Sequence, residues 1–224
     1  MNFKGQMSES CLLGGLLAVI GGYLDAYTYI ARGGVFANAQ TGNIVLLGVN
    51  LAEGNFSKAL AYLLPVLTFA AGIVISEIIR TRFKTDRHRI HWRQIIVIIE
   101  AAALLSAAYI QSDIIANTLI SFVCSLQVQA FRKINGHTLA TTMCTGNLRT
   151  ATEALYYAVK TKNKSLMSKS RQYYIIILMF ITGAAIGAVI TAKFMQKSVL
   201  FSFGALIICF IMMFIDGEAK NAAL

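Results

Sequence analysis

The sequence predicts an all-α integral membrane protein with six transmembrane helices and two broken or re-entrant half-helix segments, arranged as an inverted repeat. Composition, the spacing of apolar runs and a repeated tripeptide lead to this prediction. Hydrophobic residues make up 57% of the 224 residues and charged residues 13%, whereas charged residues are about 25% of an average soluble domain. The mean hydropathy is +0.64. This composition excludes a soluble enzyme, a disordered chain, a collagen and a disulfide scaffold.

The six predicted spans are apolar runs bounded by charged or polar residues. Each is close to the length of about 20 residues that crosses about 30 Å of hydrocarbon. The first run has no small-residue cleavage site after it, so it predicts a span rather than a removed signal peptide. The predicted spans are residues 11–31, 59–79, 94–111, 113–131, 172–192 and 198–215.

Two shorter segments, residues 33–52 and 135–159, begin with polar, glycine-containing sequence and end as short apolar helices. This order predicts an extended stretch that leads into a half-helix. Such backbone is tolerated at membrane depth only where protein packs around it or where it lines a watery cavity. Re-entrant segments and full crossings are the two alternatives for this part of the chain.

The basic residues favour the re-entrant alternative. The formal net charge is +10, and the bases cluster in short loops, above all at residues 80–93 and 160–171. Basic loops of membrane proteins lie in the cytoplasm, and both loops do so if six spans cross and both termini are cytoplasmic. Two extra crossings would place one basic loop on the wrong face. The pattern predicts the lipid bilayer as a partner and excludes nucleic acid.

The tripeptide Thr-Gly-Asn occurs twice, at residues 41–43 and 145–147, an offset of 104 residues. The same shift aligns Asp25 with Gln129 and brings the last spans of the two halves into register. We therefore expect one membrane domain over residues 1–224, built from repeats at about 1–111 and 112–224. Three crossings in each half invert the second repeat, an arrangement typical of transporters and some channels.

Several motifs resemble a known family. They are Gly-Tyr-x-Asp-Ala at residues 22–26, the Gly-Gly-Val-Phe-x-Asn-x-x-Thr-Gly-Asn stretch at 33–43, Gln-x-Gln-Ala at 127–130 and the second Thr-Gly-Asn. This chain is similar to the YoaK-like family of small bacterial multi-pass membrane proteins, an uncharacterised family. The resemblance covers most of the chain and implies the bacterial plasma (inner) membrane, but it supplies no substrate.

Candidate solute-binding residues lie where the two half-helices begin. The threonine hydroxyls can cap free backbone N–H groups, and the glycines allow close backbone approach. Two helix N-termini that meet at the midplane favour an anionic or strongly polar solute. The asparagines either extend this polar surface or bond backbone freed by the break, and the whole motif can also serve only to end and pack the half-helices. The candidates are Thr41, Gly42, Asn43, Thr145, Gly146, Asn147 and Gln129, the repeat partner of Asp25.

Charged residues inside the apolar runs are candidates for proton or ion coupling. Asp25 lies deep in the first span, where an ionised carboxylate costs roughly 2.5 to 3.5 kcal/mol, and Glu100 lies two turns into the run at 94–111. The alternative for Asp25 is a carboxyl that only fixes the broken segment. Arg149 can neutralise Asp25 or attract an anion, or it can pair with Glu153 near the cytoplasmic face.

No motif predicts catalysis, a metal or a cofactor. The histidines, His88, His91 and His137, form no ligand set, and the four cysteines have no metal-binding spacing. The leading hypothesis is a secondary transporter or channel-like permease for a small polar or anionic solute. A non-transporting membrane scaffold is the first alternative, and an intramembrane enzyme is the second. Six spans form a small bundle, so a homodimer would bury additional surface.

Overall fold

The computed structural model describes residues 10–83, 91–134 and 137–221, with side chains described as far as Met213. It is almost entirely helical, which confirms the all-α prediction. The elements in chain order are α1 Cys11–Ala31, α2 Gln40–Ala52, α3 Phe56–Phe83, α4 Trp92–Ala107, α5 Asp113–Ala130, β1 Lys133–Ile134, β2 His137–Thr138, α6 Cys144–Thr161, α7 Lys164–Phe194, the 3-10 turn η2 Met195–Ser198 and α8 Val199–Asn221. The short antiparallel pair β1 and β2 was not expected from the sequence.

Local chemistry explains where α1 begins and ends, and both ends agree with the predicted run. The Ser10 hydroxyl accepts a hydrogen bond from the Leu13 amide at 3.1 Å and so caps the first turn. After Ala31 the chain reaches Gly33 and Gly34, which both have φ of +78°. Residues with side chains rarely adopt this left-handed conformation, so the glycines end the helix and turn the chain back.

Within the described residues, four segments are long and apolar enough to cross a membrane, namely Cys11–Ala31, Phe56–Phe83, Asp113–Ala130 and Lys164–Met213. The last contains α7, the turn η2 and α8 as far as Met213. Met195, with φ of +46°, separates the two helices. The predicted run at 94–111 forms α4, which has 16 residues and ends at Ala107. This is shorter than the about 20 residues of a full span. The C-terminal boundary predicted for this run, residue 111, lies four residues beyond the end of the helix.

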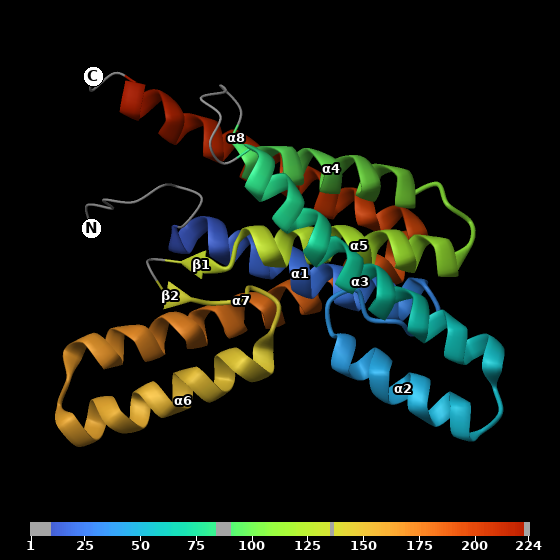
Figure 1. Ribbon diagram of the computed structural model, residues 1–224, viewed down its shortest axis with the longest axis horizontal. Helices are drawn as coiled ribbons and strands as arrows, with labels where there is room; N and C mark the ends of the chain where they lie inside the picture. The colour runs from blue at the N-terminus through green and yellow to red at the C-terminus, as the bar shows by residue number, and fades with distance from the viewer. Residues whose placement is uncertain (1–9, 84–90, 135–136, 222–224) are drawn as a thin grey trace.

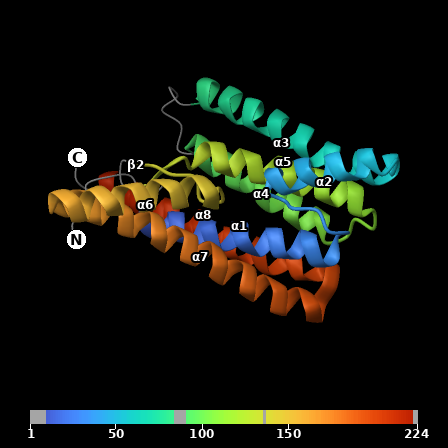
Figure 2. The same ribbon diagram turned by 90° about the horizontal axis from the view of Figure 1, so that it is seen from below.

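The helices form a bundle in which α5, α4, α8 and α1 make successive contacts. The helices α3 and α7 lie on opposite sides of this group, α3 against α5 and α7 against α1 (Figures 1 and 2). The start of α1 and the end of α8 lie at the same end of the bundle (Figure 1).

The two segments predicted to be broken have the expected form. Residues 32–39 and 139–143 are not helical, and each leads into a helix, α2 or α6. Both helices begin near the middle of the molecule and run toward opposite ends, α2 beside α3 and α6 beside α7 (Figure 1). Their N-termini therefore face each other at the centre.

A buried arginine joins the end of α1 to the turn between α4 and α5. The Arg32 side chain is 0% exposed. Its guanidinium donates to the Tyr27 hydroxyl at 2.8 Å, to the carbonyls of Ala107 and Ile110 at 2.7 and 2.8 Å, and to Asp113 Oδ1 at 3.2 Å. A buried charge is tolerated only when it is bonded in this way.

Candidate functional site

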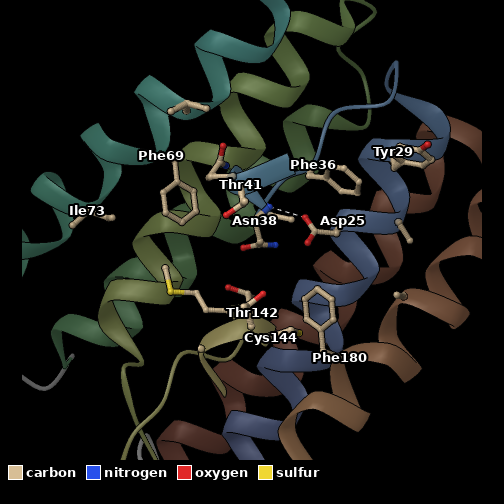
Figure 3. A pocket seen from close by; sticks show the side chains of 18 of the residues that line it. Asp25, Tyr29, Phe36, Asn38, Thr41, Phe69, Ile73, Thr142, Cys144 and Phe180 are labelled. Atoms are coloured by element: carbon tan, nitrogen blue, oxygen red, sulfur yellow. Dashed lines mark hydrogen bonds between the residues drawn. The ribbon is translucent and has the colours of Figure 1, made fainter. Parts of the chain in front are cut away.

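A pocket of about 820 Å³ lies where the two half-helices meet. Figure 3 shows that α1, the starts of α2 and α6, and side chains of α3 and α7 surround it. Of the residues predicted to bind solute or couple ions, four line this pocket, namely Asp25, Thr41, Thr145 and Gly146. Residues that are 120 positions apart in the sequence thus share one site.

The carboxylate of Asp25 both lines the pocket and holds the first broken segment. Asp25 is 6% exposed, and its Oδ1 accepts a hydrogen bond from the Asn38 amide at 2.6 Å (Figure 3). The backbone of Ala37 and Ala39 and the side chain of Asn38 are its other neighbours. Backbone N–H groups at this depth need an acceptor, and Asp25 supplies one from the adjacent helix.

The first turns of α2 and α6 are open toward the pocket. Their N-caps are Ala39 and Met143, and no side chain caps either helix. Thr41 and Thr145 are the second residues of their helices, so the prediction that their hydroxyls cap the helices was wrong. Both residues are exposed and line the pocket. The first amides of a helix have no partner within the helix. On α2 the amides of Gln40 and Gly42 bond the carbonyls of Asn38 and Ala39, so the open donors at the pocket are mainly those of α6.

Asn43 and Asn147 instead stabilise the backbone of the broken segments. Asn43 accepts from the Phe36 amide at 3.0 Å and donates to the Phe36 carbonyl at 2.8 Å. Asn147 donates to the Ala140 carbonyl at 2.6 Å. Both asparagines are buried and lie outside the pocket lining. Of the two roles predicted for them, the structure supports bonding of freed backbone, and the expected polar surface is not formed by these side chains.

Gly42 and Gly146 differ in their surroundings. A Cβ on Gly42 would lie 2.9 Å from Phe36 Cδ2, so this glycine allows the aromatic ring to pack against the start of α2. Gly42 does not line the pocket, whereas Gly146 does, and a Cβ on Gly146 would meet no atom within 4 Å. The glycines of the two Thr-Gly-Asn tripeptides therefore differ in packing.

Three other predicted site residues lie away from the pocket. Gln129 donates to the Glu77 carboxylate, which also pairs with Arg80 at 3.1 Å. Glu100 is 0% exposed on α4, and among the described residues neither of its carboxyl oxygens has a hydrogen-bond partner. Arg149 is exposed on α6 and forms no ion pair with Glu153 in the described part of the chain. The structure therefore does not support Arg149 as a charge partner of Asp25.

Sequence reasoning missed two buried polar residues of the pocket, Asn38 and Thr142. Each is 6% exposed. Among the described residues, Asn38 Oδ1 and Thr142 Oγ1 have no hydrogen-bond partner. The offset of 104 residues aligns these two positions with each other, but it aligns every other pair of the two halves as well and so did not single them out. Buried polar atoms are rarely left unpaired, and two that line the same pocket indicate a place for a polar ligand.

The remaining lining is mainly apolar. Tyr29 and Phe36 stack with their ring centroids 5.1 Å apart, and Phe69 and Phe180 contribute further aromatic walls (Figure 3). Across residues 10–83, 91–134 and 137–221, no group of three or more His, Cys, Asp or Glu side chains is arranged to hold a metal ion.

Comparison with known proteins gave one match. Residues 13–212 match the family DUF1275, described as a protein of unknown function. No curated protein and no solved structure matched the chain. An uncharacterised family was expected from the sequence motifs, and the matched family fits that expectation.

Proposed function

Because the chain belongs to the DUF1275 family, whose function is unknown, we propose from its site that it is a small membrane permease for a polar or anionic solute. The observation that carries this proposal is the pocket between the open first turns of α2 and α6. Discontinuous helices whose N-termini meet near the midplane form the solute sites of many secondary transporters and of some channels. The resemblance to the YoaK-like family remains a prediction.

The proposed architecture is a single domain over residues 1–224 with six crossings, formed by α1, α3, α4, α5, α7 and α8. Its two inverted repeats, at about 1–111 and 112–224, are supported by matching contacts. The pairing of α1 with α7 corresponds to that of α5 with α3, and α2 with α3 corresponds to α6 with α7. The hydrogen bond from Asn43 to the Phe36 carbonyl has its counterpart 104 residues later, from Asn147 to Ala140.

Close backbone approaches support the same repeat. A Cβ on Gly183 of α7 would lie 2.0 Å from the Val19 carbonyl of α1. A Cβ on Gly72 of α3 would lie 2.6 Å from the Phe122 carbonyl of α5. Small residues allow helix backbones to approach closely in membranes. Each repeat therefore uses a glycine of its long helix at the corresponding contact.

We infer that both termini face the cytoplasm of a bacterium and that the bundle crosses the plasma membrane. The end of the molecule at which α1 begins and α8 ends also holds the last turn of α3, with Arg80 and Arg82, and the strand that begins at Lys133 (Figure 1). The first turn of α7, which starts at Lys164, lies at this end as well. An excess of basic residues marks the cytoplasmic side of membrane proteins.

Asp25 is the proposed coupling or gating residue, since its carboxylate links the pocket to the broken segment through the Asn38 amide. Protonation weakens a carboxylate as an acceptor, so the charge on Asp25 can bias how tightly this segment is held. Glu100, buried on α4 without a described partner, is kept as a second candidate for ion coupling. A solute that neutralises the open helix ends completes the site.

Accessibility of the pocket tests the permease proposal against a scaffold with a dry centre. Cys144 lies at the start of α6 and lines the pocket, so it is a natural reporter. We expect charged methanethiosulfonate reagents to modify it in the purified protein, with Cys144→Ser as the control for the other three cysteines. The scaffold alternative predicts no modification that depends on Cys144. Saturable solute uptake into proteoliposomes, with Asp25→Asn alongside, then tests transport and its dependence on pH.

A further inference from the structure

The pocket has two chemically different parts. Its polar part is formed by Asp25, Asn38 and Thr142 together with the first turns of α2 and α6. Its apolar part is formed by side chains of α1, α3, α7 and the first broken segment, namely Tyr29, Ile30, Phe36, Val66, Phe69, Ile73 and Phe180. Figure 3 shows the aromatic rings around the polar group rather than mixed with it. A solute that fills about 820 Å³ of this shape has an apolar body and one polar group.

The polar part is rich in donors. On α6 the first-turn amides of Cys144, Thr145 and Gly146 donate no hydrogen bond to another described residue. The hydroxyls of Thr41 and Thr145 are exposed in the pocket and make no hydrogen bond within the described chain. Amides at helix N-termini bind carboxylate and phosphate groups. The unpaired Thr142 Oγ1, buried in the same wall, adds a further donor independent of the helix ends.

The charge of the lining limits the solute to a single negative charge. Among the described residues, no Lys, Arg or His lines the pocket. Each helix N-terminus contributes about half a positive charge, so α2 and α6 together supply about one. Asp25 carries the one carboxyl group that the described residues contribute to the lining. If it is ionised, it cancels this charge, and if it is protonated, the pocket balances one anionic group. A dianion would remain uncompensated in either state.

The groups around Asp25 do not supply a second charge. Tyr29 on its own helix, Cys144 on α6 and Cys124 on α5 are its titratable neighbours, and all three types are mainly neutral near pH 7. The facing residues of α3 and α7 in the lining are apolar. Asn38 Oδ1 is unpaired beside Asp25, so a proton on the carboxyl would give this oxygen a donor.

We propose that the pocket binds amphipathic monocarboxylates with an aromatic or branched apolar body, each together with one proton on Asp25. This inference rests on the proposed function, because it names the solute class of the same site. The carboxylate lies between the first turns of α2 and α6, and the apolar body lies against Phe69 and Phe180. The solute and its proton enter as an electrically neutral pair.

Calorimetry on the purified full-length protein with four probes tests the proposal. Three probes share a phenyl group and differ in charge, and the fourth is an anion without an apolar body. They are phenylacetate, its uncharged isostere phenylacetamide, the cation phenethylamine and inorganic phosphate. We expect phenylacetate to bind at least about 10-fold more tightly than the other three, which corresponds to about 1.4 kcal/mol. Measurements in two buffers of different ionisation enthalpy should show uptake of about one proton per phenylacetate near pH 7.

The variant Asp25→Asn separates the two parts of the proposal. The asparagine oxygen can still accept from the Asn38 amide, so the broken segment keeps its hydrogen bond. We expect the variant to bind phenylacetate without proton uptake. Tighter binding of phenethylamine would overturn the proposal and make Asp25 a counter-ion for cations, and equal binding of phenylacetamide would overturn the charge requirement. If no probe binds but Cys144 is modified, the solute class is wrong and the permease proposal stands. Absence of both overturns both.

Discussion

The contact between α1 and α7 gives the sharpest prediction about stability. A Cβ on Gly22 would lie 2.0 Å from the Phe180 carbonyl oxygen and 2.9 Å from the Ala184 amide nitrogen. Ordinary contacts begin near 3.4 Å, so the variant Gly22→Ala must separate the helices by about 1.4 Å. No side-chain rotation relieves this clash, because the atoms that are hit belong to backbone. On the same helix, a Cβ on Gly15 would meet only Met179 Cγ, at 3.7 Å.

The two variants therefore should change the free energy of unfolding in opposite directions. Overpacking costs about 1–3 kcal/mol, and a clash with backbone belongs at the upper end, about 3 kcal/mol. Alanine in place of glycine in a helix gains about 1 kcal/mol. Gly22→Ala should lose about 2 kcal/mol, and Gly15→Ala should gain up to about 1 kcal/mol. The difference of about 3 kcal/mol corresponds to roughly 6–12 °C in melting temperature for a chain of this size.

Thermal unfolding in detergent measures this difference, with a thiol-reactive fluorophore that reports exposure of the buried Cys124 and Cys209. Gly183→Ala is a reciprocal test, because its Cβ would lie 2.0 Å from the Val19 carbonyl oxygen on α1. Equal melting temperatures for Gly22→Ala and Gly15→Ala would refute the register of α1 against α7. The same result would remove the α1–α7 wall of the pocket, and with it the basis of the proposed site.

Three further predictions concern the buried polar groups and one helix cap, and thermal unfolding measures each of them. Arg32→Met leaves the four hydrogen bonds of a buried guanidinium unmade and should lower the free energy of unfolding by about 3 kcal/mol or more. The Asp113 side chain is 46% exposed, so Asp113→Asn should lower it by less than about 1 kcal/mol. Equal losses for the two variants would contradict the Arg32 network. Asn43→Leu should cost about 1–3 kcal/mol and more than Asn147→Leu, because Asn43 makes three hydrogen bonds and Asn147 makes one. Burial, and to a lesser extent a neighbouring arginine, lowers the pKa of His91 below 6.5, so the folded state resists protonation of this α4 cap. Stability should be constant above about pH 7.5 and should fall as the pH drops through about 6.5; His91→Asn should remove this component, and an unchanged pH profile would show that the cap is not the titrating group.

The helices were predictable because apolar runs and their boundaries are local properties of the chain. Four of the six predicted spans lie almost wholly within a helix of at least their length, α5 ends one residue before the predicted run at 113–131, and α1 matches residues 11–31 at both ends. The run at 94–111 failed at its end, since Tyr109 and Ile110 are apolar but belong to the turn that receives Arg32. Hydropathy cannot distinguish an apolar turn residue from a helical one when a distant side chain bonds its carbonyl.

The repeated tripeptide predicted part of the candidate site, because it too is a local property of the chain. An offset read from one tripeptide placed Thr41 and Thr145 at equivalent helix positions, and the structure brings both to one pocket. It gave no way to tell which polar side chains point inward. Gln129 aligns with Asp25, yet it bonds Glu77 outside the pocket, because α3, which packs against α5, carries this carboxylate at the contact.

The sequence by itself determined that the chain is helical, that its apolar runs suit a membrane and that two segments break into half-helices. These properties depend on composition and on neighbours within a few turns. The tertiary structure alone decided that Asp25 holds the first broken segment, that Asn43 and Asn147 bond backbone rather than solute, and that Asn38 and Thr142 face the pocket unpaired. Those roles depend on which groups helix packing brings within hydrogen-bonding distance. Residues far apart along the chain meet only when the helices have docked.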